Sequence, residues 1–388
     1  MLSNKQIEIL DEIKNDFGLY IHIPFCIEKC SYCDFYSLEY KRSIFAEYLS
    51  SLKKEIKLYG SNINAKIKTI YFGGGTPSLL NPVDVEDILC IIDNNFSILE
   101  DVEITLEANP NSLNEERIEG YKNSGVNRLS IGVQSFNDEE LKTLGRLHNS
   151  KNAKMIIKDV SKVFSNYNFD LIFAIPEQSF NKWKENIEET IKFNPPHLSL
   201  YNLQVEEGTL IQKKINNNIL DSVNQELDAR MYQYAIKKLS EASFTQYEIS
   251  NFAKKGYYSK HNLIYWKYEP YLGLGPSAHS FSSKTRFSNY TSLQKYINKL
   301  KENKLPVENL NNLSLTQRMS EKMFLGLRLM EGIDFEEFYS IFNKKLNNIY
   351  GEEIEKLVSK GLLIKRDNKI KLSSKGKLLG NKVFMEFI

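Results

Sequence analysis

The stretch "HIPFCIEKCSYCDF", residues 22–35, contains three of the four cysteines of the chain, Cys26, Cys30 and Cys33, at the spacing C-x3-C-x2-C. A closed structural zinc site uses four ligands, so three thiolates are one short. On a four-iron cluster, three thiolates would leave one iron open to a small ligand. The spacing favours an iron–sulfur cluster, and zinc or thiols without a ligand role remain as alternatives.

The first half of the chain alternates short β-rich runs with segments of helical spacing. The β-rich runs span 19–25, 67–74, 102–109, 127–134, 169–176 and 197–203. This alternation favours βαβ units and a parallel sheet, and the apolar middles of the runs suit a sheet that is covered. Six units are too few for an eightfold barrel, so we predict a partial (βα)6 barrel of the TIM type. The cysteine loop would follow its first strand, at the carboxyl end where barrel active sites are built.

After about residue 205 this pattern stops. A long amphipathic helix is expected in 224–243, followed by a segment rich in Tyr, Gly and His. The chain then turns helical and closes with two strand-like runs around Asp367, which is typical of a winged helix. We therefore predict an α/β protein with a smaller α+β, winged-helix-like domain. The predicted parts are an N-terminal extension over 1–17, the barrel over 18–210, a bridging segment over 211–300 and the C-terminal domain over 301–388.

The composition and charge of the chain limit which partners and which cellular compartment we expect. The 51 basic and 49 acidic residues give a net charge of +2, which provides no electrostatic reason to expect nucleic acid. The first 18 residues do not resemble a signal peptide, and no apolar run could span a membrane. We expect a cytoplasmic protein whose membrane contact is peripheral and mediated by partners. The oligomeric state stays open, a homodimer included. Cys90, at helical spacing, is expected in the core.

The cysteine motif has an aromatic residue, Tyr32, just before its last cysteine, and so resembles the signature of radical S-adenosylmethionine enzymes. "YIHIPFCIEKCSYCDF" (20–35) resembles the branch that contains oxygen-independent coproporphyrinogen III oxidase and the heme chaperone HemW. The resemblance implies that the three cysteines hold a 4Fe-4S cluster. It also implies that the open iron binds S-adenosyl-L-methionine, which one electron cleaves to a 5′-deoxyadenosyl radical. We expect Phe25, Tyr32 and Phe35 to shield the sulfurs.

Further motifs resemble the same family, in order, at successive strand ends. They are "YFGGGTPSLL" (71–80), "TLEANP" (105–110), "LSIGVQSFN" (129–137), "LGRLHN" (144–149) and "FDLIFAIPEQ" (169–178). In the last of these, Ala174 and Ile175 replace the usual Gly-Leu. The cofactor contacts that the resemblance implies are Tyr20, Tyr32, Gly74, Gly75, Thr76, Glu107, Gln134, Arg146 and Asp170.

The chemistry of these residues suits the roles that the resemblance implies. A glycine triplet lets backbone approach a ligand, although alone it equally indicates a tight turn. A carboxylate such as that of Glu107 can accept from ribose hydroxyls or an ammonium group. The planar fork of Arg146 pairs well with a carboxylate. His148 is interpreted as a structural hydrogen-bonding residue.

Two features separate the branches of this family. The oxidases carry a fourth cysteine two residues after the third, and this chain has Phe35 there. "KHNLIYW" (260–266) resembles the HNxxYW marker of the heme-chaperone branch and implies His261 as a heme ligand. The interpretation is a heme chaperone, without coproporphyrinogen oxidase activity, that passes heme to apo-hemoproteins, including respiratory ones at the membrane.

Two other functions remain as alternatives. An oxygen-independent oxidase would decarboxylate two propionates of coproporphyrinogen III to vinyl groups. A zinc-stabilised binding protein with a winged-helix nucleic-acid module is the third hypothesis, and the near-neutral charge argues against its nucleic-acid half.

Overall fold

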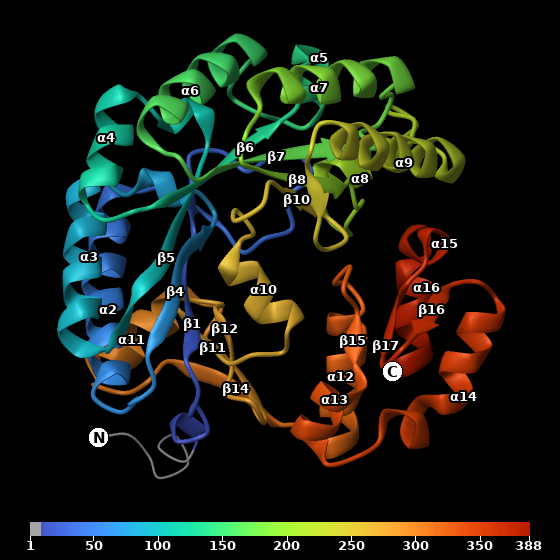
Figure 1. The fold of residues 1–388 in the computed structure, drawn as a ribbon. Coiled ribbons are helices and arrows are strands. Elements are labelled where there is room, and N and C mark those ends of the chain that lie inside the picture. The colour runs from blue at the N-terminus through green and yellow to red at the C-terminus, as the bar shows by residue number, and fades with distance from the viewer. Residues whose placement is uncertain (1–8) are drawn as a thin grey trace.

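The computed structural model describes residues 9–388. Six neighbouring parallel strands form the barrel, and helices cover their outer, convex face (Figure 1). The strands are β1 (Phe17–Ile23), β4 (Ile67–Gly74), β5 (Ile98–Ala108), β6 (Arg128–Gln134), β7 (Tyr167–Phe173) and β8 (His197–Asn202). The helices that follow them are α2 (Arg42–Gly60), α3 (Pro82–Asn95), α4 (Glu115–Asn123), α5 (Asp138–Thr143), α6 (Ser150–Val163) and α7 (Phe180–Phe193). The sheet does not close on itself, which confirms the predicted partial barrel.

Strands from the second half of the chain lengthen this sheet at both edges to twelve strands. β11 (Tyr271–Leu274) lies parallel to β1 and is followed by β12 (His279–Phe281), β13 (Thr285–Asn289) and β14 (Val307–Asn312). β10 (Asn251–Ala253) and β9 (Thr245–Gln246) extend the edge at β8. The helices of this region are α8 (Leu210–Asn216), α9 (Gln225–Glu241), α10 (Lys260–Trp266) and α11 (Leu293–Lys301). The sequence pattern did not predict these short strands.

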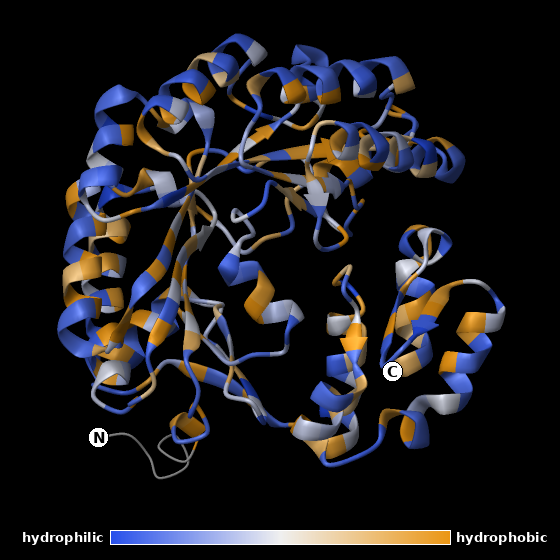
Figure 2. Ribbon diagram, viewed as in Figure 1, coloured by the Kyte–Doolittle hydropathy of each residue, from blue (hydrophilic) through white to orange (hydrophobic). Residues whose placement is uncertain are grey.

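The two faces of the sheet differ in chemistry. Leu19, Ile21 and Ile23 of β1 are fully buried and belong to the main hydrophobic core, between the sheet and its outer helices. Tyr20 and His22 alternate with them and point to the inner face. Figure 2 shows apolar and polar residues side by side along the outer helices, as one buried face requires. The inner face is therefore available for polar side chains.

Helix α10 lies on the concave side of the sheet, where it packs against β1 and β4 (Figure 1). The Ser259 hydroxyl caps its first turn by accepting from the Asn262 amide. The carboxylate of Glu103, on β5, accepts from the amides of Lys260 and His261 at 3.1 and 3.0 Å. The start of the HNxxYW segment is thus fixed inside the barrel.

The C-terminal domain has a three-stranded sheet in the order β15-β17-β16 and is built around a second hydrophobic core, which also includes Tyr268 and Phe281 of the preceding segment. Its elements are α12 (Leu315–Gly326), β15 (Ile333–Asp334), α13 (Phe335–Phe342), α14 (Leu346–Ser359), β16 (Leu363–Arg366), β17 (Lys369–Leu372), α15 (Ser374–Leu378) and α16 (Gly380–Phe384). The predicted hairpin around Asp367 is present, and Asp367 has a φ of 53°. Arg286 of β13 donates two hydrogen bonds to Glu321 of α12, which ties this domain to the extended sheet.

The domain boundaries stay predictions, and part of the extension over 1–17 lies outside the described residues. Over residues 9–388, no helix combines the length and the apolar character needed to cross a bilayer. The prediction for Cys90 was wrong, because its side chain is exposed. α3 turns Val85, Ile88 and Ile92 toward the core, and Cys90 falls on another side of the helix.

Glu55 of α2 is a buried carboxylate that joins the barrel to the segment around β11, β12 and β13. It accepts from the Gly275 amide at 2.8 Å, the Asn289 side-chain amide at 2.6 Å and the Tyr296 hydroxyl at 2.6 Å. Burial raises its pKa from 4.5 to about 7, and these three donors oppose the rise. Glu55 therefore fixes the turn between β11 and β12 at the end of β1.

Replacement of Glu55 by alanine is expected to lower the free energy of unfolding by about 3 kcal/mol or more, because three buried donors lose their acceptor. The wild type should also lose stability as the pH rises from 4.5 to about 7, because the folded state then holds the proton longer than the unfolded state. Urea unfolding across this pH range measures both effects. Glu47→Ala, which removes an exposed partner of Lys301, is the control and should change stability little. Equal losses in the two variants would contradict the assignment.

Candidate cofactor site

The cysteine loop leaves the carboxyl end of β1 and is pinned there by His22. The His22 Nε2 atom hydrogen-bonds to the Tyr36 carbonyl at 3.0 Å, and Nδ1 to the Tyr20 hydroxyl at 3.0 Å. Tyr48 donates to the His22 carbonyl at 2.8 Å. Burial lowers the pKa of His22 to about 4, so its ring is neutral at pH 7. These bonds fix the exit of the loop relative to the first strand.

The three thiols of the loop are near enough to affect one another. Burial first, and then the charges of neighbouring cysteines, raise the pKa of Cys26 and Cys33, that of Cys33 to about 11. Arg146 donates to the Cys30 sulfur at 3.3 Å, and the Thr76 hydroxyl to the Cys26 sulfur at 3.5 Å. The raised pKa values of Cys26 and Cys33 suit a cationic iron group, which would offset the charge of their thiolates.

Shielding of these sulfurs was predicted for three aromatic residues and is only partly present. Phe25 is fully buried, and Tyr32 is partly buried. Phe35 is 64% exposed, so its predicted shielding role was wrong. In this part of the sequence, the pattern alone does not show which face of the loop turns outward.

The glycine loop after β4 presses against the cysteine loop. A Cβ atom on Gly75 would lie 2.7 Å from the Phe25 carbonyl oxygen and 3.0 Å from the Cys26 sulfur. Gly74 has a φ of +114°, and a Cβ there would meet the His22 ring at 2.7 Å. Both glycines are therefore required by close approach, in addition to any contact with a ligand.

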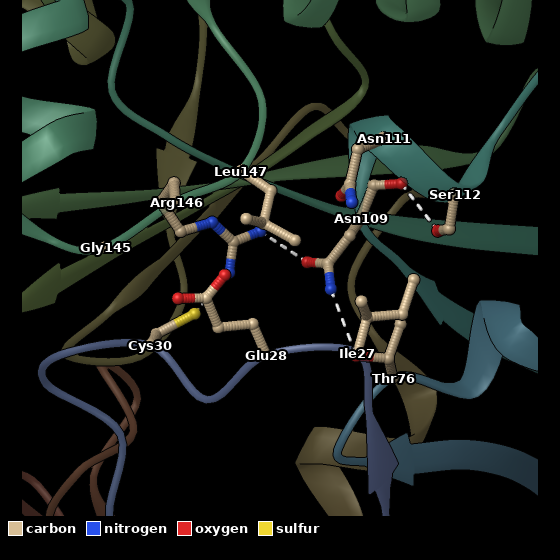
Figure 3. A pocket seen from close by; sticks show the side chains of 10 residues that line it. All are labelled: Ile27, Glu28, Cys30, Thr76, Asn109, Asn111, Ser112, Gly145, Arg146 and Leu147. Atoms are coloured by element: carbon tan, nitrogen blue, oxygen red, sulfur yellow. Dashed lines mark hydrogen bonds between the residues drawn. The ribbon is translucent and has the colours of Figure 1, made fainter. Parts of the chain in front are cut away.

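Arg146 and Asn109 link four of the predicted segments, and Figure 3 shows both side chains. Arg146 donates to Asn109 Oδ1 and, at 3.0 Å, to the Gly132 carbonyl. Asn109 donates to the Thr76 hydroxyl at 3.2 Å. Together with Cys30, these side chains line a surface cavity beside the cysteine loop. Asn109 was not among the predicted residues, although it stands in the quoted motif "TLEANP".

Two partly buried carboxyl groups, those of Glu107 and Asp170, lie on the inner face of the barrel. Glu107 accepts from the Tyr71 hydroxyl at 2.7 Å and from the Gly74 amide at 3.3 Å. Asp170 accepts from Asn168 at 2.6 Å and from Ser130 at 3.2 Å. Burial raises both pKa values, that of Glu107 to about 7, and the charge of Asp170 contributes to the rise at Glu107. Two such carboxyls suit a cationic ligand, which would relieve their repulsion.

The remaining predicted contacts lie between these groups. The pKa of Tyr32 is affected by Arg146, Cys30 and Asp170, so Tyr32 lies near both the thiols and the carboxyl groups. Tyr20 stacks on Tyr71 with 6.3 Å between ring centroids. Gln134 ends β6 with a φ of 65° and is nearly buried. The predicted cofactor contacts thus come together at the carboxyl ends of the strands. Their roles toward a cofactor stay a prediction.

His261 lies inside the barrel beside Tyr20, with 6.5 Å between the two ring centroids. It is 1% exposed, and its ring stacks on Tyr71 at 4.8 Å. Its Nδ1 atom hydrogen-bonds to Thr69 at 2.7 Å and its Nε2 atom to Tyr265 at 2.9 Å. Burial lowers its pKa to about 3. Both ring nitrogens are therefore occupied, and neither is free for a metal in this conformation. His148, bonded to the Val133 carbonyl at 3.0 Å, is buried as a structural residue.

Ala174, which replaces the glycine usual in the family, adopts a φ of +58°. This left-handed conformation favours glycine and strains alanine by about 1 kcal/mol. Ala174→Gly is therefore expected to raise the free energy of unfolding by about 1 kcal/mol, measured by urea denaturation. The control is Ala229→Gly in α9. It should lower stability by about 1 kcal/mol, because a glycine in a helix loses more backbone freedom on folding than an alanine does. A loss of stability in both variants would contradict the prediction.

Comparison with known proteins places this site in a family. Residues 20–190 match the Radical SAM superfamily, and residues 313–379 match the HemN C-terminal domain. The fold is similar to coproporphyrinogen III oxidase (HemN) from Escherichia coli, with a TM-score of 0.86, 21% identity, and coverage of 99% of this chain and 93% of the other. The fold and the matched domains define a radical S-adenosylmethionine protein with a HemN-type C-terminal domain.

Similarity to individual proteins identifies the family within this class. The chain is 35% identical to the heme chaperone HemW of Bacillus subtilis, over 95% of this chain and 98% of the relative. It is 35% identical to HemW of Lactococcus lactis, over 95% and 96%. It is 32% identical to HemW of Escherichia coli, over 96% and 98%. The chain belongs to the HemW family.

Proposed function

We propose that this chain is a heme chaperone, which binds heme and transfers it to apo-hemoproteins, and that it carries a 4Fe-4S cluster and an S-adenosylmethionine site. The observation that carries the proposal is the identity to proteins named HemW over nearly the whole chain. Phe35, in place of the fourth cysteine of the oxidases, supports the chaperone over the oxidase. The likeness to HemN concerns the fold and does not favour its reaction.

The residues present suit both cofactors. Cys26, Cys30 and Cys33 would hold three irons of the cluster. When bound, the cluster and S-adenosylmethionine supply one-electron chemistry. Glu107 and Asp170 would face the cationic part of the ligand.

The other contacts proposed for S-adenosylmethionine belong to the same face of the barrel. They are Tyr20, Tyr32, Gly74, Gly75, Thr76, Gln134 and Arg146. Arg146 already donates to the Cys30 sulfur, so it would also counter the charge of the thiolates.

The heme site is proposed on the concave side of the sheet, near α10. The HNxxYW match assigns the axial ligand to His261, and that role requires Tyr265 to release the Nε2 atom. The proposed recipients are apo-hemoproteins, including respiratory ones that are reached by peripheral contact with a membrane.

The test is anaerobic reconstitution with iron and sulfide, followed by titration with heme and, separately, by incubation with coproporphyrinogen III. We expect one heme per chain, transfer of that heme to an apo-cytochrome, and no decarboxylation. Turnover of the porphyrinogen would overturn the proposal in favour of the oxidase. His261→Ala is compared with His197→Ala, because His197 is equally buried and also bonded through both ring nitrogens. Loss of heme in the first variant alone supports His261 as a ligand.

A further inference from the structure

His279 differs from the other histidines of the chain in its exposure. The other four, His22, His148, His197 and His261, are all 7% exposed or less, and each is hydrogen-bonded through its ring. The His279 ring is exposed, and over residues 9–388 its nitrogens make no hydrogen bond. Its imidazole is therefore the one, in the described chain, that an incoming metal can reach without displacing a partner.

The position of His279 is fixed by the sheet. It begins β12, and the antiparallel pairing of Tyr271 with Phe281 puts His279 opposite Gly273, which is itself paired with Tyr20 of β1. Tyr271 contacts Tyr265 of α10, so this is the concave face. His279 therefore lies on the same face as Tyr20 and α10, two strands from the strand that leads into the cysteine loop.

The turn that precedes His279 is held rigidly. The Gly275 amide donates to Glu55, and a Cβ on Gly275 would lie 2.6 Å from the His22 carbonyl oxygen. Asn289 donates both to Glu55 and to the Gly275 carbonyl, at 2.6 and 2.9 Å. The charge of His279 also contributes to the pKa shift of His22. The exposed imidazole is thus placed beside the end of β1 by a buried network.

The two residues that lie opposite His279 on the neighbouring strands are small. Gly273 lies opposite it on β11, and Ser288 is paired with it on β13. A wide, flat ligand can approach an imidazole closely only where the side chains around it are short. Partial burial and then the charge of Arg286 lower the pKa of His279, so its ring is neutral at pH 7 and its nitrogen lone pair is available.

We infer that His279 provides an axial ligand to heme iron on the concave face of the sheet. The inference rests on the proposed heme-binding function and adds a residue to it. A ring nitrogen of His279 donates its lone pair to the iron, and no electron transfer or proton release is involved. His279 can do so in the conformation described, whereas His261 must first lose its bond to Tyr265.

The experiment titrates the anaerobically reconstituted full chain with hemin and records the Soret spectrum and the affinity. His279→Ala is expected to weaken binding about tenfold or more and to shift the Soret band. Added imidazole should restore the wild-type spectrum, since it can replace the missing axial ligand. Because His279 is exposed, the variant should melt like the wild type, and circular dichroism checks this. His148→Ala is the control histidine.

The possible outcomes separate the two proposals. If the wild type binds heme and His279→Ala binds it with the same affinity and spectrum, the inference about His279 is wrong and the chaperone proposal stands. If only His261→Ala changes the spectrum, the buried histidine is the ligand, and His279 is again excluded. If the wild type takes up no heme, both proposals fail. A changed spectrum that imidazole restores supports His279.

Discussion

Cys30→Ser is expected to abolish uptake of the cluster on anaerobic reconstitution, whereas the wild type should take up about four irons per chain. The three thiolates would be the only protein ligands of the cluster. If one of them is removed, one iron atom loses its protein ligand. Cys26→Ser and Cys33→Ser should behave in the same way. Iron and sulfide analysis, together with the visible absorption of the cluster, measures the effect.

Cys90→Ser is the matched control for these variants, because Cys90 is a free cysteine that is exposed on α3. It should bind as much iron as the wild type. Full iron content in Cys30→Ser, or an equal loss in Cys90→Ser, would contradict the proposed cluster site. Metal analysis that finds zinc and no sulfide would instead select the zinc alternative.

The affinity for S-adenosylmethionine is expected to depend on Glu107. Its carboxyl group has a pKa raised to about 7 by burial, by the charge of Asp170 and despite the hydrogen bond from Tyr71. A cationic ligand prefers the ionised carboxylate, so it must displace the proton below pH 7. The affinity should therefore rise with pH between 5.5 and 7, by up to about tenfold per pH unit. Calorimetric titration of the cluster-loaded protein measures it.

Glu107→Gln tests this assignment, because it keeps the shape of the side chain and removes its charge. At pH 8 it should weaken S-adenosylmethionine binding by about 2 kcal/mol, or roughly thirtyfold. The pH dependence should flatten, and only the contribution of Asp170 should remain. Parallel pH profiles in the wild type and in Glu107→Gln would contradict a direct role for this carboxylate.

The barrel could be predicted from the sequence because its signals are local. The run 67–74 is the strand β4 with the same bounds, since an apolar β-rich run ends there at glycines. The edge strands could not be predicted, because β12 has only three residues and depends on distant partners. Cys90 shows a different limit. The apolar residues of α3 allow more than one buried face, and only packing selects the one with Val85, Ile88 and Ile92.

The site shows the same division between local and distant information. The motifs name the residues at the strand ends, but they do not reveal which bonds those residues make. Thr69, which holds His261, is 192 positions away from it in the chain. The sequence therefore suggests His261 as a ligand without showing that its nitrogens are occupied. The sequence does not show that His279 is exposed, because its exposure becomes visible only when β11, β12 and β13 are paired.

The alternation of side chains along the barrel strands has a consequence for how this protein can evolve. On β1, Leu19 and Ile21 support the fold from one side, while Tyr20 and His22 face the interior of the barrel. Tolerance to substitution should therefore alternate from one residue to the next along the strand. Substitutions of the core-facing residues should lower the amount of folded protein in the cell, and substitutions of the interior-facing residues should change cofactor occupancy. Natural variation can then change the chemistry of the interior while the packing of the scaffold is kept.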